Sequence, residues 1–141
     1  MGARHVNANL VLKARREQAS LATALDGRGT FLLDARSPRR GTWIAIVDTR
    51  REFKLADTAV ERLLRAVEEL DEGAREEWNA CTVREFHIGL EADVDEASSS
   101  TSLNHDLLRR IVALGGSVTI TVYHQETFSV ADDSTPSDPA R

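Results

Sequence analysis

Four histidines, spread along the whole chain, are the residues of this sequence best suited to acid–base or metal chemistry: His5, His87, His105 and His124. None of them forms an HxH, HxxxH or HExxH pair with another, so the sequence encodes no local zinc site. We therefore expect no metal and no other cofactor.

One histidine belongs to a polar set with the spacing of a strand. The side chains that alternate with apolar neighbours there are Glu85, His87, Gly89 and Glu91. If this strand lies beside the last one, His87 would share a sheet face with Thr121 and Tyr123, and the face could act as an acid–base or ligand-binding patch. The simpler interpretation, which the pattern favours, is the solvent-facing side of an antiparallel sheet.

The single cysteine and an acidic loop also contain groups that could do chemistry. A nucleophilic cysteine needs a histidine partner and usually a helix N-terminus, and neither is visible near Cys81, which we interpret as a small buried hydrophobe. Asp93, Asp95 and Glu96 lack the glycine and the bidentate glutamate of a calcium loop. They predict a solvated acidic loop that could dock on a basic partner.

The charges are unevenly distributed. Residues 1–51 hold ten Lys/Arg and four Asp/Glu, a balance of +6, whereas residues 52–141 hold eight and nineteen, a balance of −11. The arginines beside a proposed hairpin, Arg36, Arg39 and Arg40 among them, could form a basic rim, or they could simply compensate the acidic remainder. The net charge of −5 disfavours general nucleic-acid binding.

The composition is that of one ordinary domain. The 141 residues are 41% hydrophobic and 29% charged, which is close to globular averages. One cysteine allows no internal disulfide, and no run approaches the roughly 20 apolar residues of a membrane span. We expect a single cytoplasmic domain over residues 1–130, followed by a disordered acidic tail over residues 131–141.

Periodicity predicts the elements that position these groups. Alternation predicts strands at residues 6–12, 83–92 and 117–124, and short apolar runs predict a hairpin of residues 30–33 and 42–47. Helical spacing predicts helices at residues 14–25, 58–70 and 103–114, the second capped by Asp57 and the third by Ser102 or Asn104.

This order predicts an α+β fold, a two-layer sandwich. We expect a mostly antiparallel sheet of four or five strands with about three helices packed on it, related to ferredoxin-like units. The run from Thr42 to Val47 is apolar on both faces, which predicts a central strand covered on both sides. The first, fourth and fifth strands alternate, so one face of the sheet is expected to meet solvent or a partner.

From Trp43 to Tyr123 the sequence resembles a bacterial family known only as domain of unknown function 4279. The resemblance rests on Trp43, the Leu63-Leu64 helix, Phe86–Leu90, Leu107-Leu108, Leu114-Gly115 and Tyr123. The N-terminal third diverges, because the family's Leu-Gly…Pro-Thr pattern before the tryptophan is absent. The resemblance implies no catalytic residues, and some members of the family look like immunity proteins encoded near bacterial toxins.

These observations favour a non-enzymatic protein-interaction module over an enzyme, with an immunity-type role that neutralises a basic partner toxin. The expected interface comprises Glu85, His87, Glu91, Asp93, Asp95 and Glu96. The alternative is a small-molecule-binding or catalytic domain that uses the open sheet face around His87 and Tyr123. A third alternative is a homodimer that pairs its open sheet faces or edges.

Overall fold

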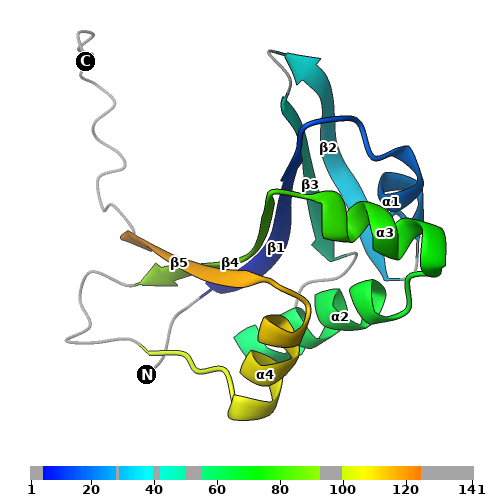
Figure 1. Cartoon of the computed structure of the whole chain (residues 1–141). Helices are drawn as coiled ribbons and strands as arrows, with labels where there is room; N and C mark the ends of the chain where they lie inside the picture. The colour runs from blue at the N-terminus through cyan, green and yellow to red at the C-terminus, as the bar shows by residue number, and fades with distance from the viewer. Residues whose placement is uncertain (1–4, 28, 40–41, 50–54, 93–99, 125–141) are drawn as a thin grey trace, which may run out of the picture.

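A computed structural model describes residues 5–27, 29–39, 42–49, 55–92 and 100–124; for His5, residues 34–39, Ala92 and His124 it describes the backbone alone. The strands are β1 (His5–Ala14), β2 (Thr30–Arg39), β3 (Thr42–Thr49), β4 (Val83–Ala92) and β5 (Ser117–His124). The helices are α1 (Ala19–Ala24), α2 (Ala56–Glu68), α3 (Glu72–Ala80) and α4 (His105–Ala113). Figure 1 shows the helices gathered on one side of the sheet.

The sheet has the strand order β2-β3-β1-β4-β5, and only the β4–β5 pair is parallel. β1 and β2 are joined through α1 and separated by β3, and the helical segment after β3 leads to β4 on the other side of β1. This is the split βαβ arrangement of ferredoxin-like folds. Helix α4 and strand β5 extend that core by one parallel crossover. The predicted α+β class, mostly antiparallel sheet and ferredoxin-like units are therefore confirmed.

The core lies between the sheet and the helices, as the alternation predicts. The inward side chains of three strands, among them Leu10, Trp43 and Phe86, are essentially inaccessible to solvent. They meet the apolar stripe of α2, in which Val60, Leu63, Leu64 and Val67 are completely buried. Glu61 and Arg65 on the outer side of α2 form an i,i+4 ion pair, with 3.0 Å between Nε and Oε2.

The central helical segment differs from the prediction. α2 begins at Ala56 and ends at Glu68, so Asp57 lies in its first turn and is not its cap. A separate helix follows at once, because Asp71 accepts a hydrogen bond from the Ala74 amide at 2.9 Å and starts α3. Gly73 lies inside α3.

Two other helices begin later than predicted. β1 continues to Ala14, and α1 is a six-residue helix from Ala19 to Ala24, so only the second half of the helix expected at residues 14–25 is formed. For α4, the structure selects one of the two predicted caps: Asn104 accepts a hydrogen bond from the Leu107 amide at 3.0 Å.

Strand β3 is covered on one side only within the described chain. Trp43, Ala45 and Val47 are buried against the helices, and α2 contacts β3. Ile44 and Ile46, on the other face, are half-buried, and none of the described helices covers them. The predicted second layer over this strand is thus not found among the described residues.

Three side chains fix α4 to the rest of the helical layer. The Trp78 indole of α3 donates to the Leu114 carbonyl at 2.9 Å. The Arg84 guanidinium joins the carbonyls of Trp78 and Gly115, at 3.1 Å each. Arg110 of α4 forms ion pairs with Glu61 and Glu68 of α2. None of the described helices is long and apolar enough to cross a membrane.

Candidate functional site

The uncovered face of the sheet brings polar side chains from four strands together. The register places Asp48 of β3, Asn9 of β1, His87 of β4 and Thr119 of β5 in one row across the sheet. The next row toward the N-terminus of β1 contains Asn7, Gly89 and Thr121, and the one beyond it contains Glu91 and Tyr123. The parallel pairing of β4 with β5 therefore confirms that His87 shares a face with Thr121 and Tyr123.

Two hydrogen bonds link β4 to β5 on this face. His87 Nε2 lies 2.8 Å from Thr121 Oγ1, and the Thr119 hydroxyl donates to Glu85. A histidine beside a hydroxyl can act as its general base. Here Glu85 bonds Thr119 and not His87, so it does not orient the imidazole as the third member of a triad does. The geometry is that of a polar ladder between strands, suited to recognition by hydrogen bonding.

Gly89 leaves room for the side chains around it. A Cβ atom at this position would lie 2.7 Å from Asn7 Oδ1 and 3.3 Å from Tyr123 Cε2. The tyrosine ring thus lies over the backbone of β4, with 54% of the residue exposed. Aromatic cover of a strand glycine stabilises the sheet locally, and it leaves the tyrosine edge available to a partner.

The structure tests the placement of only part of the predicted interface. Glu85, His87 and Glu91 lie on the same face of β4, as predicted. Asp93, Asp95 and Glu96 lie outside the described residues, as do Arg40 and the predicted acidic tail. Arg36 and Arg39 belong to β2, and their side chains are outside the description, so the basic rim remains a prediction.

Cys81 has the character the sequence indicates. It is 4% exposed, and its sulfur lies 3.5 Å from the Glu77 carbonyl oxygen at the end of α3. Burial raises the pKa of this thiol to about 11, opposed by the charge of Arg84. Since the thiolate is the nucleophile, a buried neutral thiol of this kind is chemically inert.

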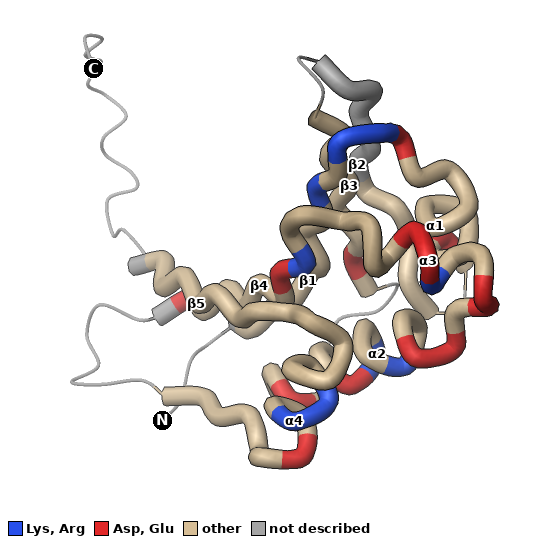
Figure 2. The backbone as a smooth tube through the Cα atoms, in the orientation of Figure 1, with Lys and Arg blue, Asp and Glu red and all other residues tan. Residues whose placement is uncertain are grey.

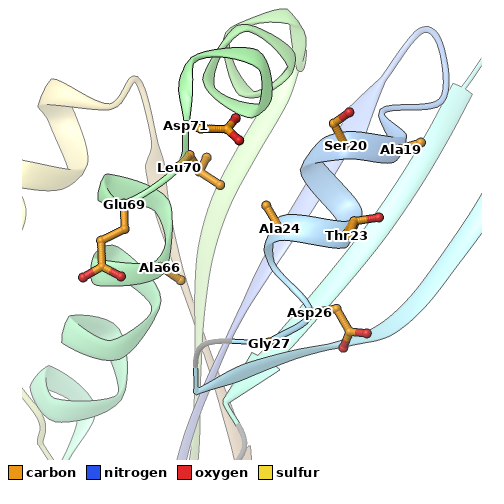
Figure 3. A pocket seen from close by; sticks show the side chains of 10 residues that line it. All are labelled: Ala19, Ser20, Thr23, Ala24, Asp26, Gly27, Ala66, Glu69, Leu70 and Asp71. Atoms are coloured by element: carbon orange, nitrogen blue, oxygen red, sulfur yellow. The ribbon is translucent and has the colours of Figure 1, made fainter.

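Sequence reasoning missed a groove between the helices. Its volume is about 600 Å³, and α1 with the turn after it faces the end of α2 and the start of α3 across it (Figure 3). The walls are mostly small residues, among them Ala19, Ser20, Ala24 and Ala66. Only the run of small residues in α1 hinted at it, because its two sides are about 45 residues apart in sequence.

Three carboxylates lie around this groove, at Asp26, Glu69 and Asp71. Two of them also order the local backbone: Asp26 accepts from the Leu32 amide at 2.9 Å, and Asp71 caps α3. A carboxylate has about four acceptor sites, so these bonds leave its negative charge in place. The groove therefore combines small apolar walls with an acidic mouth.

The helical layer around the groove carries the net charge of the protein. Residues 56–80 contain eight Asp/Glu and three Arg, a balance of −5 that equals the balance of the whole chain. Figure 2 shows these acidic positions along α2 and α3.

A smaller hollow of about 550 Å³ at the β1–α1 turn has Arg15 and Arg16 in its lining. Within the described ranges, no group of three or more His, Cys, Asp or Glu side chains could hold a metal ion.

Comparison with known proteins gives no relative from which a role could be transferred. No family model matches the chain, and neither a curated protein nor a solved structure matches it. The resemblance to domain of unknown function 4279 therefore stays a prediction, and arguments about function rest on the geometry of this chain.

Proposed function

We propose that this protein is a non-enzymatic interaction module that binds a basic protein partner through its acidic helical layer. The observation that carries the proposal is the groove between α1, α2 and α3, which has three carboxylates around it and lies in a segment of balance −5. An immunity-type role, in which the module neutralises a basic toxin of a bacterial cell, is the form that the predicted family resemblance favours.

The groove has the dimensions and chemistry to take a basic side chain of such a partner. A lysine or arginine has an apolar stem and a charged head. Its stem would lie along Ala24 and Ala66, and its head would meet Asp71, which points toward α1, while Asp26 and Glu69 add negative charge at the rim. The surrounding negative charge would accelerate the encounter and select against acidic partners. The polar face with Glu85, His87 and Glu91 lies on the opposite side of the sheet from this groove and would be a separate contact area.

Co-purification of the tagged full-length chain from its native host tests the proposal. We expect a stoichiometric basic protein to be retained by the wild type and lost with Glu69→Arg, which reverses a charge beside the groove, and with Ser20→Trp, which fills the groove. Glu76→Arg is the matched control, because Glu76 is an exposed carboxylate of α3 outside the groove lining. Circular dichroism would verify that each variant is folded.

Two results would contradict the proposal. One is the absence of any stoichiometric partner for the wild type. The other is a partner that Glu76→Arg weakens as much as Glu69→Arg does, since the interaction would then be general electrostatic attraction and not recognition by the groove.

A second candidate is a small-molecule-binding or catalytic role of the open sheet face, favoured by the 2.8 Å contact between His87 and Thr121. A fragment screen followed by amide chemical shifts would test it. Shifts that cluster on β4 and β5 around Tyr123 support the candidate, and shifts confined to the helices exclude it.

A further inference from the structure

Exposed apolar side chains are concentrated on the last helix and the last strand. Seven large hydrophobic residues of the described chain are exposed, and five of these belong to α4 or β5: Leu108 (42%), Val112 (72%), Ile120 (53%), Val122 (47%) and Tyr123 (54%). Single exposed apolar residues are ordinary, but a group of them on adjacent elements marks an interaction surface.

The orientation of α4 turns its two exposed residues away from α2. Leu107 and Ile111 are buried in the core, and Arg110 points to α2, where it pairs with Glu61. Residues four apart share a helix face, so Leu108 and Val112 share the flank turned away from α2. Because α2 packs over β1 and β3, this flank is on the side of the β5 edge.

The β5 edge lacks the devices that keep edge strands from pairing. β5 contains no charged residue apart from a terminal histidine and no proline, and it follows β4 through eight consecutive pairs. The other edge strand, β2, contains Asp34, Arg36, Pro38 and Arg39 and has two register shifts against β3. Charges, prolines and bulges are how natural proteins block edge-to-edge association. Among the described residues, one edge of the sheet is thus protected and the other is suited to pairing.

We propose that a second copy of this chain occupies the β5 edge, so that two five-stranded sheets join into one continuous sheet. The two β5 strands run antiparallel about a two-fold axis near Ile120. Val118 then lies opposite Val122 of the partner subunit on the helical face, and Thr119 opposite Thr121 of the partner subunit on the other. β-Branched pairs of this kind stabilise antiparallel ladders, and no like charges meet along the strand.

The strand's own composition is what favours a second copy over a different protein. An isologous interface must be complementary to itself, and an uncharged run of alternating Val, Thr and Ile meets that condition in the antiparallel direction. The flanks of the two α4 helices lie on the same side of the joined sheet, so Val112 and Leu108 cover the apolar residues across the axis.

The available surface is of the size that a dimer needs. The five exposed side chains lie on both faces of the edge, with Tyr123 on the polar face and the other four on the helical side, and together present on the order of 400 Å² of apolar area. A specific interface buries roughly 800 Å² per partner. The backbone edge of the eight-residue strand, about 27 Å long, and the polar atoms around it supply the remainder.

Sedimentation of the full-length chain over a range of micromolar concentrations tests the proposal. We expect the wild type to approach twice the monomer mass and Ile120→Lys to weaken association at least about tenfold. Leu33→Lys is the matched control, because Leu33 is 55% exposed on the opposite edge strand, and it should leave the dimer intact. Under mild oxidation, Ile120→Cys should form a covalent dimer and Leu33→Cys should not, while the buried Cys81 stays reduced.

Three results would overturn the proposal. The first is a wild type that is monomeric at every concentration. The second is a dimer that Leu33→Lys weakens and Ile120→Lys does not, which would move the interface to another edge. The third is a monomeric full-length chain that becomes dimeric when shortened after His124, which would assign the β5 edge to residues 125–141.

Discussion

The ion pairs between α2 and α4 allow a quantitative test of how much contacts within the helical layer contribute to the stability of the fold. Arg110 meets Glu61 at 2.7 and 3.3 Å and Glu68 at 2.8 and 2.9 Å, so one guanidinium bridges two carboxylates through four hydrogen bonds. The three side chains are 24%, 34% and 35% exposed. We expect Arg110→Met, which keeps the apolar stem and removes the charge, to destabilise the fold.

The expected loss of stability follows from how far the ion-paired side chains are exposed to solvent. A solvent-exposed ion pair contributes about 0.2–1 kcal/mol, and bidentate geometry with partial burial places a pair near the top of that range. Two such pairs give about 1–2 kcal/mol, or a fall of roughly 0.5–1 M in the urea midpoint. Arg109→Met is the control, because Arg109 is 70% exposed and pairs within α4 with Asp106; its cost should stay below about 0.5 kcal/mol.

The pH dependence of the free energy of unfolding provides a second measure of the same ion pairs. The hydrogen bond from Arg110 holds the pKa of the Glu61 carboxyl below its ordinary value, against the opposing effect of burial and with added help from Arg65. A lowered folded-state pKa stabilises the fold above the unfolded pKa of about 4.3, and this contribution is lost as the pH falls through the folded value. The stability gap between the wild type and Arg110→Met should therefore shrink from pH 7 toward pH 3. A gap that is absent at pH 7, or that does not change with pH, would refute this reasoning.

Two further predictions concern Cys81 and Gly89. Because its pKa is raised to about 11, Cys81 should react with a disulfide reagent at pH 8 at least about 100-fold more slowly in the native protein than in urea; comparable rates would show that the thiol is accessible. Gly89→Val should destabilise the fold by about 1–3 kcal/mol, because the new side chain meets Asn7 and Tyr123. Adding Asn7→Ala should restore part of that loss in urea titrations, and strictly additive costs would show that the two residues do not compete for the same space.

The parts of the fold that periodicity could reveal are those in which a stripe or an alternation faces the core. The strand around Phe86 and the helix around Leu63 have such patterns and were predicted. Helix α3 was not, because only Ala74 and Trp78 are buried in it and Gly73 lies in its first turn. Helix α3 begins where the Asp71 side chain accepts a hydrogen bond from the Ala74 amide. A search for apolar periodicity does not detect such a cap, and a glycine at this place argues against a helix.

In the candidate sites, too, alternation reveals which face a residue occupies but not which residues it meets there. Alternation placed Glu85, His87 and Glu91 on one face, but only the register against β5 joins His87 to Thr121. The register pairs Val118, Ile120 and Val122 with Phe86, Ile88 and Leu90, which puts them on the helical side. Alternation could not show that the helices leave Ile120 and Val122 exposed, because the area a helix covers depends on where α4 is held, and α4 is held by partners far away in sequence.

Those partners explain why the last helix and strand form an addition to the ferredoxin-like core with a surface of its own. Arg110 ties α4 to α2, and Trp78 and Arg84 tie its C-terminal end to α3. All three contacts hold α4 against the helices and strand β4, away from the β5 edge. The flank with Val112 is left uncovered as a consequence, next to a strand that has none of the protection found on β2. The charged side chains of this region hold α4 in place and none lies on Ser117–Tyr123, which is the arrangement that the proposed pairing of two β5 strands requires.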